Sequence, residues 1–207
     1  MARSHPAREI EIKLSVPDAA QARRKIKQAG FRVSRPRVFE NNLIYDTPEL
    51  ALRRKGTLLR VRKAGPIFKL TYKGPDAGGR HKSREELEIE ISHGKLMTAI
   101  LERLGFEPVF RYEKFRTEFE QPGTRGTVTL DETPIGFFLE LEGAPRWIDR
   151  TARLLGFAAS DYILKSYGRL YLEFRKTRPR APRDMVFKSS KPAPRRAARQ
   201  SAGPPLE

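Results

Sequence analysis

The sequence predicts an α+β fold, a closed antiparallel β-barrel with a charged lumen and helices packed on the outside. Before residue 175, most of the chain alternates polar and apolar residues with a period of two, which is typical of β-strands. Strand after strand carries charged residues at successive positions of one face. Short stretches with apolar residues at helical spacing are available to cover the opposite faces.

The first predicted strand covers residues 9–14 and places Glu9, Glu11 and Lys13 on one face and aliphatic residues on the other. Further strands are expected at residues 59–62, 67–73, 84–91, 112–119, 127–131 and 137–142. Their charged faces contain the bases Arg60, Arg62, Lys69, Lys73, Arg84, Lys114 and Arg116, and the acids Glu86, Glu88, Glu90, Asp131, Glu140 and Glu142.

The uniform charge of these faces favours a barrel over an open sheet. In the ordinary arrangement, the polar face of each strand meets water and the apolar face meets the core. Neighbouring like charges such as Glu86 and Glu88 repel one another, so an open face of this kind is unfavourable. A sheet that closes with its charged faces inward sets acidic strands opposite basic strands across a water-filled lumen.

Helices are expected between and after these strands, at residues 18–30, 95–104, 146–155 and about 161–174. Asp18 is suited to cap the first helix, with Gln21 three residues later, and Gly30 ends it. We interpret the apolar residues of these helices, including Trp147, as contacts with the outside of the barrel rather than as a ligand site.

The composition excludes several classes of protein. The chain has 207 residues, no Cys and three His, which excludes disulfide frameworks, thiolate zinc sites and cysteine nucleophiles. No apolar run approaches the ~20 residues of a membrane span, and residues 1–8 lack the apolar core of a signal peptide, so we expect a soluble, cytoplasmic protein. The formal net charge of +17 indicates phosphate-bearing partners, such as nucleic acid, nucleotides, polyphosphate or an anionic membrane surface.

The composition changes at Arg175. The segment 175–207 holds ten basic and two acidic residues, is rich in Pro, Ala and Ser, and has few large apolar residues. Such a segment buries too little surface to offset chain entropy, so we expect a disordered tail. A solvated tail with weak nonspecific anion binding is the simpler interpretation, and an anchor for RNA, DNA or acidic lipid is the alternative.

The predicted lumen combines two kinds of ligand. Clustered carboxylates without His or Cys suit Mg²⁺ or Mn²⁺, which prefer oxygen ligands. Arg and Lys suit a phosphate chain, because Arg can bind two phosphate oxygens at once. Together they indicate a metal–polyphosphate complex, in which the acids hold the metals and the bases neutralise the remaining phosphate charge.

Short motifs in a fixed order support this chemistry. They are Glu-Ile-Glu-Ile-Lys at 9–13, Tyr-Asp-Thr-Pro at 45–48, Leu-Arg-Val-Arg at 59–62, Leu-Thr-Tyr-Lys at 70–73, Arg-Glu-Glu-Leu-Glu at 84–88, Lys-Phe-Arg at 114–116, Leu-Asp at 130–131, the acidic strand at 136–143 and Lys-Ser-Tyr at 165–167. This series resembles the CYTH superfamily, the triphosphate tunnel metalloenzymes, and most of all its bacterial class IV adenylate cyclase branch. The resemblance runs from about residue 8 to 174, which implies a catalytic domain of residues 1–174 and a separate tail.

The resemblance implies a role for each lumen residue. It implies that the metal ligands are Glu9, Glu11, Glu140 and Glu142 and that the triphosphate ligands are Lys13, Arg60, Arg62, Lys73, Lys114 and Arg116. It implies that the catalytic residues are Lys73, Glu88 and Asp131, with the last two holding a second Mg²⁺ or Mn²⁺ ion or orienting its water. Pairing within the lumen is sufficient to explain Glu86, Glu90, Lys69 and Arg84, and a turn at the tunnel mouth explains Tyr45 and Asp46.

The reaction itself stays open, because one fold supports several chemistries. A cyclase would use the ribose 3′-hydroxyl of ATP to attack the α-phosphorus, and a triphosphatase would use water to attack the terminal phosphorus of inorganic triphosphate or a nucleotide. Ile44 replaces the first of two Tyr in the thiamine triphosphatase branch, which disfavours thiamine triphosphate. Overall similarity favours the cyclase.

A noncatalytic module that binds polyphosphate or RNA is the third hypothesis. It is disfavoured because inward carboxylates repel phosphate unless a metal is present. On the enzyme hypotheses, deleting residues 175–207 should leave turnover nearly unchanged. The oligomeric state is open, and a homodimer is compatible with the sequence.

Overall fold

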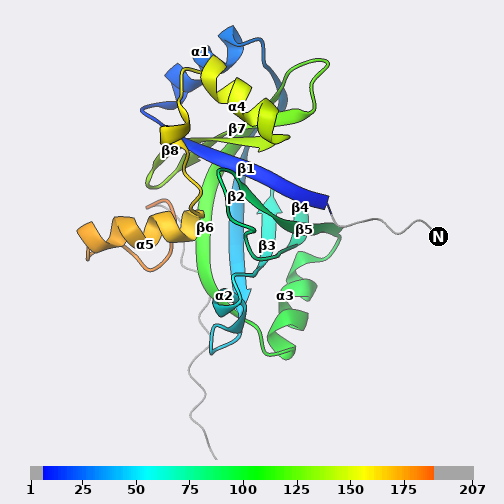
Figure 1. Ribbon diagram of the computed structural model, residues 1–207. Helices are drawn as coiled ribbons and strands as arrows, with labels where there is room; N and C mark the ends of the chain where they lie inside the picture. The colour runs from blue at the N-terminus through cyan, green and yellow to red at the C-terminus, as the bar shows by residue number, and fades with distance from the viewer. Residues whose placement is uncertain (1–6, 189–207) are drawn as a thin grey trace, which may run out of the picture.

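The computed structural model describes residues 7–188, in which eight antiparallel strands close into a barrel (Figure 1). The strands are β1 (Ala7–Val16), β2 (Arg32–Asp46), β3 (Leu58–Ala64), β4 (Ile67–Lys73), β5 (Lys82–Ile91), β6 (Glu107–Glu120), β7 (Gly126–Thr133) and β8 (Gly136–Gly143). Around the barrel they follow the order β1-β5-β4-β3-β2-β6-β7-β8, and β8 pairs with β1 to close the sheet. The predicted fold class is therefore confirmed.

The pairing of β1 with β8 sets the position of the acidic residues. Glu11 lies opposite Glu142, and Lys13 lies opposite Glu140. Because Leu141 and the aliphatic residues of β1 are buried in the core outside the barrel, these charged residues face the lumen. The first and last strands of the barrel therefore bring the two predicted acidic pairs together.

β2 is the strand that the alternation pattern did not predict. It pairs with β3 on one side and with β6 on the other. Its register against β6 shifts at three places, and it contains Pro36. Each shift changes which residues face the lumen, so the period-two pattern is lost although the strand is continuous.

Two helices, α1 (Ala19–Gln28) and α4 (Pro145–Leu154), pack together over β1, β7 and β8 (Figure 1). Asp18 caps α1 as predicted, since its Oδ1 accepts a hydrogen bond from the backbone N–H of Gln21 at 2.7 Å. On another side of the barrel, α3 (Gly94–Arg103) packs against β3, and α2 (Ala51–Arg54) is a short turn that follows β2. As expected, α1 and α4 cover the apolar outer faces of β1, β7 and β8. The expected packing is wrong for most of α3, where Leu96, Ile100 and Leu104 are exposed, and the outer face of β5 is also exposed at Leu87 and Ile89.

The last helix begins later than predicted. Residues 159–161 form a 3₁₀ turn, and α5 spans Tyr167–Thr177 instead of residues 161–174. The chain between them is extended because Ile163 and Lys13 exchange backbone hydrogen bonds of 2.9 and 3.0 Å. Ser166 then caps α5, with its Oγ accepting from the N–H of Arg169 at 3.3 Å.

The predicted boundary at residue 175 is wrong, because it falls inside α5. The expected disorder is also wrong for residues 175–188, which pack against β6 with Met185 fully buried. The composition gave the wrong prediction here because it does not report that Met185 is buried or that the segment forms backbone hydrogen bonds with β6. The rest of the predicted tail, residues 189–207, lies outside the described residues. None of the helices within residues 7–188 is long and apolar enough to cross a membrane.

Replacing Leu141 with Ala should destabilise the barrel. Leu141 is fully buried under α4, so its loss leaves a cavity, and the free energy of unfolding should fall by about 2–5 kcal/mol. Leu87→Ala is the matched control, because Leu87 also stands between two lumen glutamates but is 49% exposed. Urea unfolding of both variants measures how much each change lowers the free energy of unfolding. Equal losses would contradict the assignment of the hydrophobic core to the side of the barrel under α1 and α4.

Candidate active site in the barrel lumen

The lumen contains a cavity of about 1270 Å³ that is lined by charged side chains from all parts of the barrel. The predicted residues that line it are Glu9, Glu11, Lys13, Arg60, Arg62, Lys69, Lys73, Arg84, Glu86, Glu88, Lys114, Arg116, Glu140 and Glu142. Glu90 and Asp131 do not line this cavity. The structure therefore brings together most of the side chains that the strand pattern predicted to face inward.

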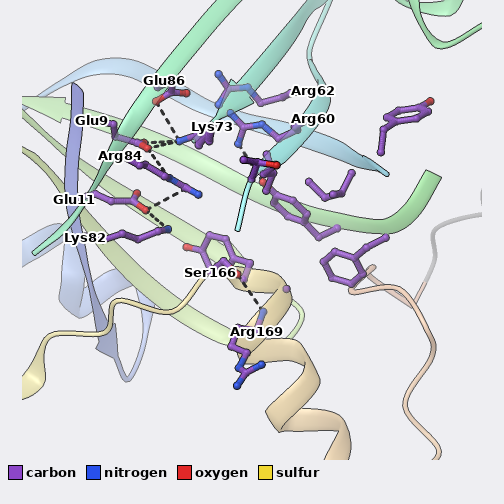
Figure 2. A pocket seen from close by; sticks show the side chains of 18 of the residues that line it. Glu9, Glu11, Arg60, Arg62, Lys73, Lys82, Arg84, Glu86, Ser166 and Arg169 are labelled. Atoms are coloured by element: carbon purple, nitrogen blue, oxygen red, sulfur yellow. Dashed lines mark hydrogen bonds and ion pairs between the residues drawn. The ribbon is translucent and has the colours of Figure 1, made fainter. Parts of the chain in front are cut away.

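Lys73 on β4 is held between acids of β1 and β5 (Figure 2). Its Nζ donates to both carboxylate oxygens of Glu9, at 2.5 and 2.6 Å, and lies 3.2 Å from Glu86. Arg84 donates to the other side of Glu9 at 3.3 Å. This group forms because Lys73 is opposite Glu86 and Glu9 is opposite Arg84 in the strand registers.

The next lumen residue along β1 makes a second group. Glu11 accepts from Lys82 Nζ at 2.6 Å and from Lys13 Nζ at 3.3 Å, and Lys13 also lies 3.1 Å from Glu140. Burial opposes ionisation of Glu11, but Lys13 and then Lys82 hold its pKa well below the ordinary value. Lys82 was missed by the sequence analysis, although it stands two residues before Arg84 and continues the same face of β5.

Glu88 on β5 accepts hydrogen bonds from several bases of β3 and β4. Its carboxylate accepts from Lys69 at 2.7 Å, Arg62 at 3.1 and 3.2 Å and Arg60 at 3.4 Å, and from Thr71 Oγ1 at 2.8 Å. Burial is outweighed by Arg62 and the other donors, so the pKa of Glu88 is lowered to about 2. In this arrangement Glu88 orders the basic wall, and its predicted catalytic role stays a prediction.

Asp131 lies on the interior face of β7, in line with Thr127 and Thr129, but Lys114, Arg116 and Tyr167 cover it, so it does not line the cavity. It is fully buried and accepts from Lys114 Nζ at 2.8 Å, from Arg116 at 2.7 and 2.8 Å, and from the hydroxyl of Tyr167 at 2.7 Å. Arg116 also pairs with Glu140. Asp131 therefore positions two predicted triphosphate ligands and the start of α5, which favours a positioning role over the predicted catalytic one.

Two further residues contact the lumen bases. Glu40 on β2 is buried 3.7 Å from Lys114 and 3.5 Å from Arg62, and these bases, with Arg116, lower its pKa to about 2 against the effect of burial. Tyr112 on β6 accepts from Arg60 Nη1 at 3.2 Å. The register shifts of β2 hid Glu40, whereas the alternation of residues places Tyr112 on the same face as Lys114 and Arg116 without indicating a role for it.

The tunnel mouth contains the Tyr45–Asp46 segment. Asp46 accepts hydrogen bonds from the backbone N–H groups of Thr47, Leu52 and Arg53 at 2.8, 2.8 and 2.9 Å. It fixes the turn that leads into α2, as expected for this motif.

The acidic cluster fits a divalent cation in its donor chemistry. The pKa of Glu142 is raised to about 7 by its enclosure in the tunnel and by the negative charges of Glu9, Glu86 and Glu11. Lys73 opposes this shift, and Glu142 remains exposed to solvent. In the described residues Glu142 has no ion pair, while Glu9, Glu11 and Glu140 are paired with bases. Accordingly, no three acidic or histidine side chains within residues 7–188 already converge as a metal site. The cluster has carboxylate crowding that a cation would relieve, but its acids must first exchange partners.

The family model of the CYTH domain matches residues 7–191. The chain belongs to the CYTH domain family. Membership of this family of tunnel metalloenzymes implies dependence on a divalent metal.

Similar proteins support the assignment to the CYTH family. A Methanocaldococcus jannaschii protein, whose name suggests an adenylate cyclase, is 30% identical over 134 residues, which are 65% of this chain and 75% of that protein. A Pyrococcus horikoshii structure has a TM-score of 0.68 at 27% identity, covering 81% of this chain and 99% of the other.

Two more distant structures share the CYTH fold. One is a Vibrio parahaemolyticus protein, also named for a suspected adenylate cyclase, with a TM-score of 0.71 at 23% identity over 81% of this chain and 99% of the other. The other is a Hippeastrum protein whose description reports a dominant triphosphatase activity, with a TM-score of 0.59 at 18% identity over 82% of this chain and 96% of the other.

Asp131→Asn should destabilise the CYTH barrel strongly. The change removes the negative charge that pairs with Lys114 and Arg116 in the barrel interior. Breaking a buried ion pair lowers the free energy of unfolding by about 3–5 kcal/mol. Glu88→Gln is the control, because Glu88 is partly exposed to the tunnel and its partners can meet water. Thermal unfolding should show a much larger drop for Asp131→Asn, and similar drops would refute the positioning role.

Proposed function

We propose that this CYTH protein is a divalent-metal-dependent enzyme that acts on a nucleoside triphosphate, as a class IV adenylate cyclase-like protein that converts ATP to cyclic AMP and pyrophosphate. The charged lumen supports binding of the triphosphate. The relatives whose names suggest adenylate cyclase support the reaction.

The observation that carries this proposal is that the cavity changes character along its length. Toward β1, β5 and β8 its wall is charged, whereas beside α5 the apolar side chains of Ile44, Phe110 and Leu172 and the ring of Tyr112 line it together with three arginines. The rings of Phe110 and Tyr112 stack with their centres 6.0 Å apart, and they pack in turn on Tyr171 and Tyr167. This group offers a nucleobase an apolar edge of the cavity, which a bare inorganic triphosphate would not use. The cavity lining therefore adds an apolar surface next to the charged residues, and the sequence motifs did not predict it.

Binding on this proposal is an exchange of partners. Without substrate, the bases of the lumen neutralise the acids, as Lys73 does for Glu9 and Lys13 for Glu140. A triphosphate offers oxygens to the same bases, so these cations can turn from carboxylate to phosphate without losing an anionic partner. The carboxylates released in this exchange are the ones that would hold a metal.

The proposed metal ligands are Glu9, Glu11, Glu140 and Glu142, which lie on the paired strands β1 and β8. A bound Mg²⁺ or Mn²⁺ ion supplies neutralisation and polarisation of the phosphate oxygens. Two ions are consistent with the number of carboxylates. The chain's own contribution is to orient the phosphate chain with Arg60, Arg62, Lys114 and Arg116, and to stabilise the charge that grows on the leaving pyrophosphate.

In the proposed cyclisation, the ribose 3′-hydroxyl gives up its proton to water or a carboxylate of the lumen, its oxygen forms a bond to the α-phosphorus, and the bond to the bridging oxygen of pyrophosphate breaks. The enclosed lumen holds the phosphate chain in one orientation, which favours attack within the same molecule. Arg169, Arg175 and Arg183 line the cavity beside α5 and add positive charge that attracts the anionic substrate.

Hydrolysis of the triphosphate is the second candidate function. The Hippeastrum protein shares the fold and is described as having dominant triphosphatase activity, so this barrel is compatible with water as the attacking group. The same bases and acids would serve both reactions, because they contact the phosphates and the metal rather than the attacking oxygen.

Product analysis tests the function. Purified protein is incubated with Mg²⁺ or Mn²⁺ and with ATP or inorganic triphosphate, and the products are separated. Cyclic AMP with pyrophosphate is the expected result with ATP. Orthophosphate instead would select the triphosphatase, and binding without either product would contradict both enzymatic proposals in favour of a binding module.

Glu142→Gln should remove metal-dependent turnover without unfolding the protein. Glu142 has no ion pair in the described part of the chain, so the change leaves no lysine or arginine uncompensated, and activity should fall by at least about 100-fold. Glu173→Gln is the control, because Glu173 is an exposed acid on α5 that pairs with Lys165. Rates at saturating metal, with thermal unfolding alongside, measure the effect, and full activity of Glu142→Gln would reject the metal-ligand assignment.

A further inference from the structure

The wall of the barrel is incomplete beside the first half of β6. Strand β7 pairs with β6 only from Phe115 to Glu120, so residues 107–114 extend beyond β7. The segment 182–187, here called the C-terminal strap, lies along this uncovered edge. The N–H of Met185 donates to the carbonyl of Arg111 at 3.0 Å, and the N–H of Glu113 donates to the carbonyl of Met185 at 2.9 Å. The strap thus adds a short parallel pairing to β6.

Side chains tie the strap down on both sides of Met185. Asp184 accepts from the backbone N–H of Arg111 at 3.0 Å, and Glu113 accepts from the N–H of Phe187 at 3.0 Å. The hydroxyl of Tyr171 on α5 donates to the carbonyl of Pro182 at 2.8 Å. The side chain of Met185 is fully buried in the cluster that contains Tyr112, Tyr167 and Tyr171.

The residue between the two strap contacts is Tyr112. The strap fixes the backbone at Arg111 and Glu113, and Tyr112 between them faces the cavity, where its hydroxyl accepts from Arg60 Nη1 at 3.2 Å. Arg60 is buried, and Glu88 and Thr71 are its other side-chain partners. The position of the Arg60 guanidinium therefore depends on Tyr112.

We propose that the C-terminal strap is a positioning element of the active site, which holds Tyr112 and through it orients Arg60 toward the phosphate chain. The inference rests on the proposed function only in assigning Arg60 to triphosphate binding. It reverses the expectation that everything after residue 174 is dispensable, and it places the functional boundary of the chain beyond the strap.

A strap that only stabilised the fold would have a different signature. Weakening it would lower the melting temperature and leave the affinity of the folded protein unchanged. A strap that acts through Tyr112 changes affinity for triphosphate, and this change disappears when the Tyr112 hydroxyl is already absent, because residues that act through one another are not additive.

The test is a double-mutant cycle read by calorimetric binding of inorganic tripolyphosphate in the presence of Mg²⁺. Met185→Ala is compared with Tyr112→Phe and with the double variant, in the full chain. We expect Met185→Ala and Tyr112→Phe each to weaken tripolyphosphate binding by about tenfold, as for loss of a hydrogen bond to a charged group, and the double variant to be no weaker than either. Asp184→Ala removes a hydrogen bond of the strap without opening a cavity and provides a second variant if Met185→Ala does not fold.

Matched controls separate positioning from stability. A chain that ends at Lys188 keeps the strap and should bind like the full chain, whereas the same chain carrying Asp184→Ala should bind about tenfold more weakly. Leu155→Ala removes a buried residue of the core under α1 and α4, a cluster separate from the one that holds Met185, and should lower the melting temperature without weakening binding.

Each outcome decides between the proposals. Unchanged affinity of the folded Met185→Ala and Asp184→Ala variants, or additive losses in the double variant, would overturn the positioning role while leaving the proposed function intact. Absence of tripolyphosphate binding by the unaltered protein would overturn both. Weaker binding by the chain that ends at Lys188 would place the determinant after the strap and would also overturn the inference.

Discussion

Compensation of enclosed charge is the constraint on which this structure depends. A barrel whose inner faces carry glutamates, lysines and arginines is stable only if most of its enclosed charges lie near opposite ones, since desolvating an unpaired ion costs several kcal/mol. The register of β1 against β8 meets that need by setting Lys13 opposite Glu140. The same register brings Glu11 beside Glu142, so the geometry that stabilises the closed barrel also concentrates carboxylates on two neighbouring strands.

On the proposed function, this compensation would make the lumen a site that exchanges partners when the ligand binds. Lysines and arginines that neutralise carboxylates in the structure are the groups suited to phosphate, and the carboxylates are suited to hard cations. A ligand that brings both phosphate and metal can replace both sets of contacts at once. A ligand that brings only one leaves buried charges without partners, which gives a physical reason for a tunnel of this kind to prefer a metal–triphosphate complex over either component.

Segments outside the regular barrel complete the tunnel. Asp131 connects the wall to the start of α5 through Tyr167, and Met185 connects the end of the described chain to β6. The strap of Met185 lies where β7 no longer covers β6. The closed sheet therefore supplies the charged interior and the lining aromatics Phe110 and Tyr112, while α5 and the residues after it pack against these aromatics.

The alternation of residues was enough to predict the barrel in outline, because a period of two fixes which face of a strand is apolar, and it placed residues such as Glu9, Arg60 and Glu140 in the lumen. It was also possible to predict the cap at Asp18, which depends on local contacts alone. The place of Glu40 could be learned only from the folded chain, because the register shifts in β2 are set by its neighbours β3 and β6 rather than by its own residues. Alternation also placed Asp131 on the inner face, but its burial under Tyr167, like the burial of Met185, depends on segments distant in sequence whose contacts leave no periodic signal in the chain.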